Sequence, residues 1–532
     1  MRINMRRALG IGTVAAALAG LTCHVPASHA QPAATAARAA PSDAPPARGA
    51  RPNIVFILID DLGWRDLGVA GSTFYETPAI DRLARDGIRF TNAHSAYPRC
   101  VPSRYAILTG RNPARAQVPG GPESLRPSDY TIAEALRDNG YATFFAGKWH
   151  EGKTPDSQPE AQGFDINIGG SSAGMTGSHL YPWDVGKRPL GPGLDTGKPG
   201  EYLADRLTDE TIDFIDAHQR TRPDQPFLVY LSHYGVHTPL EGKPELVDKF
   251  RKKIAAMGGV RPDGYLPRDG QTKKYQDNAV YAAMVASIDE SVGRVRAALD
   301  RLGIADDTLI IFTSDHGGLS NRGAHSRSER ATSNLPLRAG KGHNYEGGLT
   351  VPMIIAWPGH VEPGSVTGEF TVGTDHYPSM LAAAGLPLQP GLHVDGLSYL
   401  PLLEGGKMPA GRPVYWYSPR PRTRQTGDMV SGAIRIDNWK YYLSYDPSVP
   451  SELFDLAADP YEQTDLSATR PAKAAALREK LTAWLKSIDA IAPRPEAAAT
   501  GNETKKARRA ARRAASDDIA PDSTDADGNE DE

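Results

Sequence analysis

The sequence has little cysteine, no excess of charge of one sign, and a single long apolar run. Among its 532 residues are two cysteines, and 60 Lys and Arg stand against 63 Asp and Glu, which gives a formal net charge of −3. A charge this close to balance gives no reason to expect a nucleic-acid partner. The length allows a large core and more than one domain.

The long apolar run lies near the N-terminus and has the form of an export signal. Three arginines precede apolar residues 8–21, and small residues at 27–30 offer a cleavage site. This pattern predicts a secretory signal peptide over residues 1–30 rather than a membrane span. We therefore expect an exported protein, periplasmic or secreted, without stable membrane insertion after the signal is cleaved. Residues 31–50, rich in Ala and Pro, are predicted to form a flexible leader.

Removal of that signal leaves Cys100 as the only cysteine of the mature chain, without a partner for an intramolecular disulfide. Such a leftover cysteine in an exported protein calls for an explanation. Pro102 is preset for the first turn of a helix, and Gly110 ends the run that follows. We therefore predict that Cys100 stands at a helix N-terminus, where unpaired N–H groups favour anions. A helix cap with a small buried thiol is the alternative that this segment alone leaves open.

Strands and helices alternate through most of the chain. Residues 53–59 are a continuous apolar run that suits a parallel strand buried on both faces. Strand-like runs at 141–146, 227–232 and 309–313 are separated by helical segments. This alternation of strands and helices predicts an α/β fold with a mostly parallel sheet covered by helices on both faces.

A helix is predicted between the first two strands of this series. Thr77 is placed as its N-cap, Pro78 as its first helical residue and Gly87 as the C′ glycine that ends it. A second strand is then predicted around residues 88–92, which completes one strand–helix–strand unit.

Polar residues follow the predicted strands at the points where the strands end, and we expect them to converge on one site. Taken singly, each of them would more often be a turn residue, a helix cap or a core histidine. Three of them are aspartates with hard oxygen donors, and no cysteine or histidine cluster accompanies them, which suits Ca²⁺ or Mg²⁺ better than zinc. The residues are Asp60 and Asp61, Cys100 through its loop, Lys148 with His150, His237, and Asp315 with His316.

Beyond residue 410 the pattern changes to shorter strand-like pieces followed by a helix near residues 472–488. We predict a catalytic domain over 51–410 and a smaller C-terminal α+β subdomain over 411–492. From residue 493 a basic block is followed by an acidic one, which predicts a disordered charged tail over 493–532.

Several short motifs stand in the order found in one enzyme family. The sequence C-V-P-S-R at 100–104, followed by L-T-G-R at 108–111, resembles the signature of the type I sulfatases, in which the cysteine is oxidised to formylglycine. The resemblance covers about residues 51–490. Its other motifs are D-D-L-G at 60–63, T-P-A-I-D-R-L-A at 77–84, G-K-W-H at 147–150, H-T-P at 237–239, S-D-H-G at 314–317 and Y-E-G-G at 345–348.

Two positions depart from the commonest family pattern. Leu349 and Thr350 stand where many members have a hydrophobic residue and Arg, and His316 stands where some members have Asn. The first departure concerns contacts with the substrate, and the second is a known variant of the family.

The resemblance implies an alkaline-phosphatase-like fold and a catalytic domain that hydrolyses sulfate esters. It also implies that one Ca²⁺, preferred over Mg²⁺, is held by Asp60, Asp61, Asp315, His316 and the modified Cys100. The hydrate of formylglycine would attack the sulfur of the ester. His237 would protonate the departing alcohol, and His150 would deprotonate the second hydroxyl of the hydrate. The implied catalytic residues are Cys100, Arg104, Lys148, His150, His237 and Lys341.

Two partners are implied by the same resemblance: an enzyme that makes formylglycine, and a sulfated small molecule or glycan as substrate. The Gly-rich segment G-F-D-I-N-I-G-G at 163–170 resembles one in bacterial sulfatases that act on carbohydrates, so a carbohydrate sulfate is favoured over a simple aryl ester. Two alternatives stay open. One is a phosphate or phosphonate monoester hydrolase on the same fold, although the chain shows no second Asp and His cluster for a two-zinc centre. The other is a non-catalytic binder of sulfated glycans whose Cys100 is never modified.

Overall fold

The computed structural model describes residues 51–116, 125–184 and 190–493, which fall within one compact unit. The predicted signal peptide, the leader and the tail beyond residue 493 lie outside these residues. None of the helices in the described part combines the length and apolar character that a membrane span needs.

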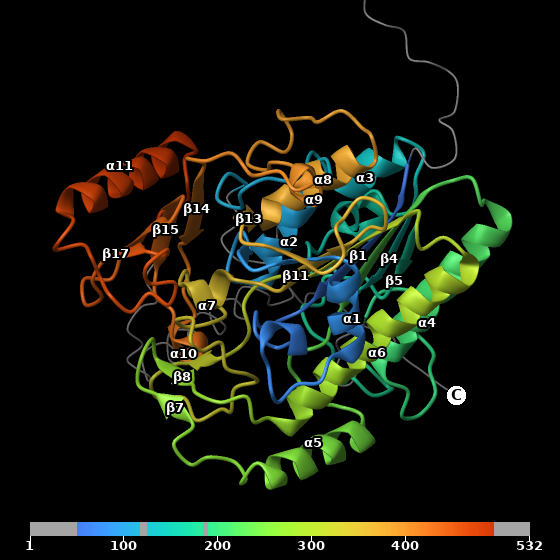
Figure 1. The fold of residues 1–532 in the computed structure, drawn as a ribbon, viewed down its shortest axis with the longest axis horizontal. Helices are drawn as coiled ribbons and strands as arrows, with labels where there is room; N and C mark the ends of the chain where they lie inside the picture. The colour runs from blue at the N-terminus through green and yellow to red at the C-terminus, as the bar shows by residue number, and fades with distance from the viewer. Residues whose placement is uncertain (1–50, 117–124, 185–189, 494–532) are drawn as a thin grey trace, which may run out of the picture. The chain divides into compact units, whose positions relative to one another are not determined.

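A large sheet forms the centre of the fold (Figure 1). It has eight strands in the order β12-β2-β11-β9-β1-β6-β4-β5. All neighbouring strands are parallel except that β11 runs antiparallel to β9 and β2. This confirms the predicted α/β fold with a mostly parallel sheet. The strands are β1 (Asn53–Ile59), β2 (Ile88–Phe90), β4 (Ala142–Gly147), β5 (Ile166–Ile168), β6 (Phe227–His233), β9 (Thr308–Ser314), β11 (Met353–Ala356) and β12 (Ser365–Thr367).

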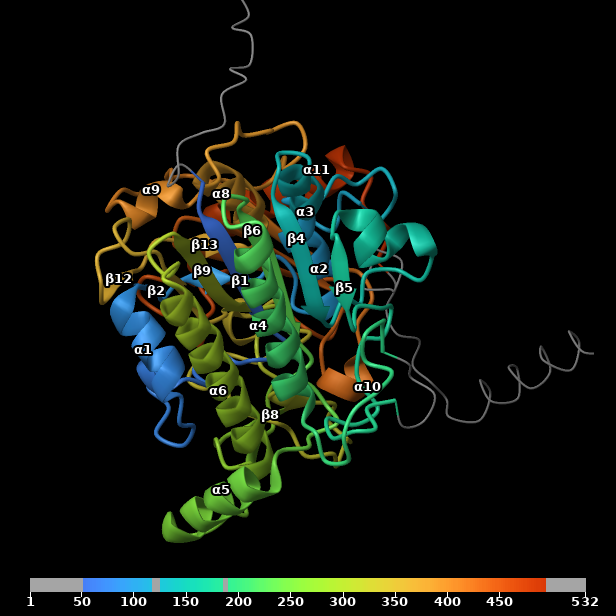
Figure 2. The same cartoon turned by 90° about the vertical axis from the view of Figure 1, so that its right-hand side faces the viewer.

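Helices cover both faces of this sheet, and the side chains of β1 alternate between two cores. Odd-numbered residues from Val55 to Ile59 pack in one core with α1, α4 and α6, which lie in front of the sheet in Figure 2. Even-numbered residues from Ile54 to Leu58 pack in a second core with α2, α3 and α8. A strand buried on both faces needs apolar residues at every position, which is why the run at 53–59 lacks alternation. The helices are α1 (Pro78–Asp86), α2 (Cys100–Thr109), α3 (Ile132–Arg137), α4 (Leu203–Thr221), α6 (Ala279–Leu302) and α8 (His376–Ala383).

The C-terminal part is a four-stranded antiparallel sheet with one helix packed on it. Leu477, Leu481 and Leu485 of the helix share a core with Ile434 and Tyr441 of the sheet. This confirms the predicted α+β character, while the boundary at residue 411 stays a prediction. The elements are β14 (Pro413–Ser418), α10 (Thr423–Thr426), β15 (Ser431–Ile436), β16 (Trp439–Ser444), β17 (Glu452–Asp455) and α11 (Pro471–Ser487).

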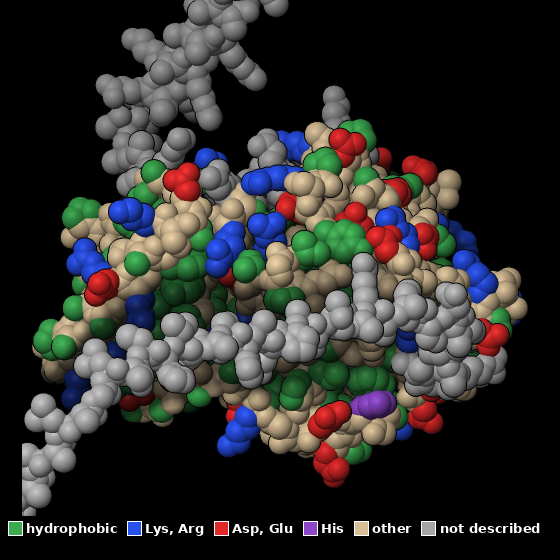
Figure 3. Space-filling model, turned by 90° about the horizontal axis from the view of Figure 1, so that it is seen from above, with side chains coloured by type: hydrophobic (Ala, Val, Ile, Leu, Met, Phe, Trp, Pro, Cys, Tyr) green, Lys and Arg blue, Asp and Glu red, His purple; other side chains and the backbone are tan. Residues whose placement is uncertain are grey.

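Two small sheets, three further α-helices and four short 3-10 helices complete the described part. On the face seen in Figure 3, positive and negative side chains are mixed, in keeping with the near-neutral net charge. The remaining elements are β3 (Ala93–His94) with β13 (Thr371–Val372), β7 (Tyr265–Leu266) with β8 (Gln271–Lys273) and β10 (Asn321–Arg322), α5 (Pro244–Ala256), α7 (Glu346–Leu349) and α9 (Leu400–Leu403).

Gly87 follows α1 at the predicted position, but its backbone lacks the left-handed conformation that is common for a glycine after a helix. Its φ is −135°, in the extended region that any residue adopts. A Cβ atom at this position would lie 2.1 Å from the carbonyl oxygen of Ile355 in β11. The helix thus ends where it was predicted to end, but the chain needs glycine here because a neighbouring strand passes too close for a side chain.

We expect Gly87→Ala to lower the free energy of unfolding by about 2 kcal/mol, because the backbone of β11 must move to admit the methyl group. Urea denaturation followed by tryptophan fluorescence measures the change. Gly391→Ala is the matched control, since a Cβ atom there meets no other atom within 4 Å. Equal stability of Gly87→Ala and the wild type would contradict the close approach of β11.

Candidate active site

Four neighbouring strands, β9, β1, β6 and β4, deliver their following loops to one edge of the large sheet. Hydrogen bonds connect the ends of these strands. The N–H of Asp60 donates to the Gly235 carbonyl and the N–H of Asp315 donates to the Ile59 carbonyl, both at 3.1 Å. The predicted convergence of the strand ends is what the structure shows. The residues brought together are Asp60, Asp61, Cys100, Arg104, Lys148, His150, His237, Asp315, His316 and Lys341.

Cys100 is the first residue of α2, as predicted, and only 7% of it is exposed. Its Sγ lies 3.3 Å from Nε2 of His316 and 3.6 Å from Oδ1 of Asp60. Burial alone would raise the pKa of this thiol, but the positive charges of Lys148, Lys341 and His316 lower it well below its usual value. Three cationic side chains thus add to the preference of the helix N-terminus for an anion.

A set of four buried side chains brings its possible ligand atoms within 4.8 Å of one another. The Oδ2 atom of Asp61 has no hydrogen-bond partner among the described residues. The ring of His316 has its Nδ1 atom 3.0 Å from the Gly317 carbonyl, which fixes Nδ1 as the donor and turns Nε2 toward the set. Carboxylate oxygens with one imidazole nitrogen fit a divalent cation. The set consists of Asp60, Asp61, Cys100 and His316.

A proton and a metal ion would compete for the same Nε2 atom of His316. Burial lowers the pKa of this imidazole, but Asp315 and Cys100 outweigh burial and raise it to about 9. Nε2 also lies 3.3 Å from Oδ1 of Asp61. A bound cation would replace the proton as the positive charge that these acidic groups need.

Asp315 lies beside this set but not within it. Its Oδ1 atom accepts the N–H of Asp61 at 3.2 Å, and its Oδ2 atom accepts from Nε of Arg104 at 3.0 Å. Burial and the nearby Asp60 raise its pKa to about 7. Both of its oxygens are thus engaged by the protein, and its predicted part as a metal ligand stays a prediction.

Two lysines each bind one of the paired aspartates. Nζ of Lys148 lies 2.5 Å from Oδ2 of Asp60, and Nζ of Lys341 lies 2.5 Å from Oδ1 of Asp61. Lys148 is fully buried, and burial is tolerated because its charge is paired. The repulsion that two adjacent carboxylates would suffer is offset by this pairing.

The two candidate proton-transfer histidines are less buried than the rest of the cluster. Burial lowers the pKa of His150 to about 4, and burial together with Lys341 lowers that of His237. Nδ1 of His237 lies 2.7 Å from the Thr238 carbonyl, so its Nε2 faces Asp61 at 3.9 Å. The His150 ring is packed against Gly174, where a Cβ atom would come within 2.3 Å of Nε2.

The comparisons with known proteins agree with this site. The sequence profile of the family described as Sulfatase matches residues 52–386, and the profile described as N-sulphoglucosamine sulphohydrolase, C-terminal, matches residues 340–490. The chain belongs to the sulfatase family. As such it is a sulfuric ester hydrolase.

Two curated sulfatases and one solved structure illustrate the likeness. N-acetylgalactosamine-6-sulfatase of Homo sapiens is 32% identical over 400 residues, which cover 69% of this chain and 68% of that protein. Arylsulfatase A of Homo sapiens is 32% identical over 468 residues, which cover 78% and 83%. The structure of Ps i-CgsB in complex with k-i-k-neocarrahexaose has a TM-score of 0.69 and 28% identity, and the match covers 87% of this chain and 97% of that one. These likenesses confirm the predicted alkaline-phosphatase-like fold.

Sequence reasoning missed the residues that hold the cluster of this sulfatase in place. Oγ of Ser232, near the end of β6, is 2.7 Å from Nη1 of Arg104 and 2.7 Å from the Lys148 carbonyl. His179 holds the loop after β6, since its Nε2 lies 3.2 Å from the His237 carbonyl. Neither residue stands in a charged motif or directly after a strand, so no sequence signal marks them.

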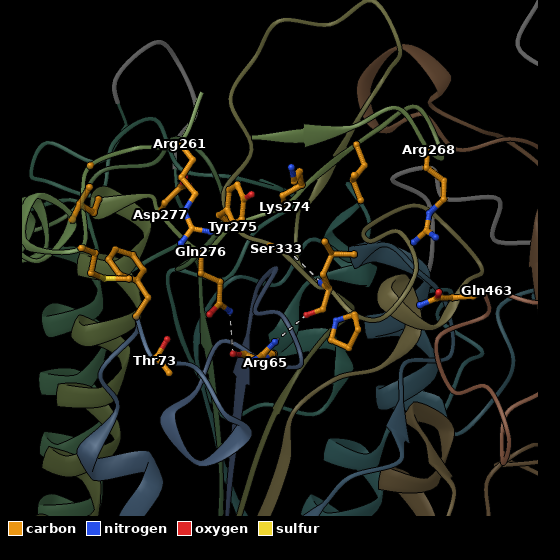
Figure 4. Close-up of a pocket in the computed structure, with 17 residues that line it drawn as sticks. Arg65, Thr73, Arg261, Arg268, Lys274, Tyr275, Gln276, Asp277, Ser333 and Gln463 are labelled. Carbon is orange, nitrogen blue, oxygen red and sulfur yellow. Dashed lines mark hydrogen bonds between the residues drawn. The ribbon is translucent and has the colours of Figure 1, made fainter. Parts of the chain in front are cut away.

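A separate cavity of about 730 Å³ opens next to the loop that follows β1 (Figure 4). Arg65 from that loop and Arg261, Arg268 and Lys274 from the region of β7 and β8 stand around it. None of the predicted site residues of this sulfatase lines the cavity. It is therefore distinct from the cluster around Cys100.

Proposed function

We propose that this sulfatase removes a sulfate ester from a carbohydrate, using a formylglycine made from Cys100 and a bound Ca²⁺. The observation that carries the proposal is the position of Cys100. Its buried thiol stands at the N-terminus of α2, within 3.6 Å of two members of the possible metal-binding set, Asp60 and His316. A side chain made there would meet a cation and a sulfate ester at once.

The residues of this site fit the cation by their chemistry. Asp60, Asp61 and His316 would hold it, with the modified Cys100 beside them, and the Oδ2 atom of Asp61, which has no hydrogen-bond partner among the described residues, is a ready ligand. Asp315 is proposed as a further ligand. Bound Ca²⁺ supplies positive charge to the oxygens of the substrate and of the modified side chain. Formylglycine, once formed and hydrated, supplies a carbon that carries two hydroxyl groups.

Lys148 and Lys341 are proposed to hold the sulfate group. Their Nζ atoms lie on the two neighbouring aspartates and bring two positive charges into one buried space. Charge-assisted hydrogen bonds from such lysines to sulfate oxygens are stronger than bonds between neutral groups. Arg104 would position the modified side chain indirectly. Its guanidinium binds Asp315 and also donates to the Lys148 carbonyl, so it links Asp315 to the loop after β4.

His237 and His150 are proposed to move protons at opposite ends of the reaction. Nε2 of His237 faces the space above Asp61, where it would give a proton to the departing alcohol oxygen, and its lowered pKa makes the protonated ring a strong acid. His150 hydrogen-bonds Cys100, and with a pKa of about 4 it is neutral near pH 7. The ring nitrogen that faces Cys100 is therefore free to accept a proton from the modified side chain.

A carbohydrate substrate is supported by the relatives. The curated N-acetylgalactosamine-6-sulfatase is named for an amino-sugar sulfate, and the Ps i-CgsB structure holds an oligosaccharide. We also propose that the chain is exported to the periplasm or beyond, because its first 30 residues have the form of a signal peptide. A formylglycine-generating or equivalent enzyme would then be its maturation partner.

Mass spectrometry of the tryptic peptide 100–104 tests the central step. In protein purified from its native host, we expect an aldehyde in place of the Cys100 thiol, detected by its mass and by reaction with a hydrazine probe. A thiol alone would contradict the proposal and favour a non-catalytic glycan binder.

A screen of matched sulfate, phosphate and phosphonate monoesters on that same sample separates the two enzyme hypotheses. We expect turnover of the sulfate ester to exceed that of the other two. Faster turnover of the phosphate or phosphonate ester would favour the alternative hydrolase on the same fold.

A further inference from the structure

Three exposed arginines follow the end of β14, in the sequence P-R-P-R-T-R at residues 419–424. We call Arg420, Arg422 and Arg424 the arginine rim. Among the described residues, no carboxylate lies within 4.0 Å of their guanidinium groups, whereas Arg412 on the same sheet is 2.6 Å from Asp375. The rim therefore carries positive charge that the described part of the chain does not neutralise.

The arginine rim is attached to the loop that carries Cys100. Arg99, the residue before Cys100, donates from Nη1 to the Arg420 carbonyl at 3.3 Å and is paired with Asp428 at 2.5 Å. Asp428 also accepts the backbone N–H of Arg422 at 3.2 Å. One buried carboxylate thus ties the backbone of the rim to the start of α2.

The same segment is attached to the loop that carries Lys341. Nε2 of His343 lies 2.9 Å from the Thr426 carbonyl, just past the rim. Gly342 is packed so closely that a Cβ atom there would lie 2.9 Å from Oγ1 of Thr426. The rim is therefore fixed between two loops of the active site rather than left as a free surface strand.

A further arginine stands beside the rim. A fourth cation adjoins the segment, since Nη2 of Arg330 donates to the Gln425 carbonyl at 3.3 Å. Four arginines thus stand at the segment that is attached to the loop of Cys100.

We propose that the arginine rim binds a second acidic group of the substrate, a sulfate or a carboxylate, on the sugar next to the one that loses its sulfate. The proposal rests on the function proposed above, because it takes the scissile sulfate at Cys100 as its fixed point. Guanidinium groups bind sulfate and carboxylate through two parallel hydrogen bonds, and unpaired ones add long-range attraction for an anion. The substrate class is then an acidic oligosaccharide, and a sulfate ester with a neutral leaving group would not use the rim.

The test compares a triple variant, Arg420→Gln with Arg422→Gln and Arg424→Gln, with the wild type. Dissociation constants are measured by calorimetry for a disulfated disaccharide and for a monosulfated disaccharide that contains a uronic acid. We expect the triple variant to weaken binding by on the order of ten-fold, the sum of three partly exposed ion pairs, and the loss to shrink at high salt. Weakening confined to one disaccharide would identify sulfate or carboxylate as the bound group.

The matched control removes the same charge elsewhere, through Arg85→Gln, Arg220→Gln and Arg251→Gln on exposed positions of α1, α4 and α5. We expect this control to bind both disaccharides as the wild type does. Equal affinity of the rim variant and the wild type, equal weakening in the control, or no binding of either disaccharide by the wild type would overturn the proposal. Failure of the wild type to release sulfate from either disaccharide would instead contradict the proposed function, since the binding comparison needs no turnover.

Discussion

Cys100→Ala is expected to lower kcat/KM for a sulfate ester by at least about 10⁴-fold, the scale of loss when a covalent nucleophile is removed. Alanine offers neither a thiol to oxidise nor a carbon that can carry two hydroxyl groups. The side chain is the first residue of α2, where alanine keeps the helix because it has the highest helix propensity. Release of 4-nitrophenol from 4-nitrophenyl sulfate measures the effect.

Cys100→Ser is the matched control for this experiment. Serine keeps a hydroxyl close to the position of the thiol but supplies only one, so we expect it to be inactive in steady-state turnover as well. Circular dichroism and thermal unfolding should show both variants folded, which separates loss of chemistry from loss of structure. Wild-type turnover by the alanine variant would rule out a nucleophile at residue 100.

The fold was largely accessible from sequence because its strands are buried on both faces. A run such as residues 53–59 has few alternatives, and β1 is indeed buried at every position. The order of the strands was not accessible in the same way. β1 pairs with β9 and β6, so that Ile59 lies opposite Ser314 on one side and His233 on the other, and local sequence carries no signal for such distant pairing.

For the candidate site, the charged residues could be predicted from sequence, but the residues that support them could not. Aspartates and histidines directly after buried strands are unusual enough to be noticed, because burial of a charge demands a partner. Ser232 is a small residue inside a strand, and its contact with the Lys148 carbonyl exists only because β4 and β6 are neighbours. The position of Asp315 beside the possible metal-binding set likewise depends on its bond to Arg104, which sequence cannot supply.

The arginine rim shows a further limit of sequence reasoning. Exposed arginines are usually solvated, and nothing in P-R-P-R-T-R distinguishes this segment from an ordinary surface loop. Only the fold brings the loop after β14 against Arg99, 321 residues before Arg420 in the chain, through the bond of Arg99 to the Arg420 carbonyl. The role proposed for these arginines therefore depends on neighbours that only the fold provides.

Asp61→Asn is expected to weaken Ca²⁺ binding by at least about 100-fold, since even the outer partners of a metal site are worth about 10- to 100-fold. The residue has a φ of +65°, and asparagine tolerates this left-handed conformation, so the backbone should not change. The variant loses the charge of a carboxylate whose Oδ2 atom has no hydrogen-bond partner among the described residues. Calorimetric titration of chelator-treated protein with Ca²⁺ measures the affinity, and turnover at saturating Ca²⁺ measures recovery.

Asp437→Asn is the control for that substitution, because Asp437 also has a positive φ, of +53°, but lies in the turn between β15 and β16. It should leave both Ca²⁺ affinity and turnover unchanged. Asp315→Asn should weaken Ca²⁺ less than Asp61→Asn does, because both oxygens of Asp315 are already engaged by Arg104 and the Asp61 N–H. Normal Ca²⁺ stoichiometry and a normal rate in Asp61→Asn would remove this aspartate from the cation site and leave it only the pairing with Lys341.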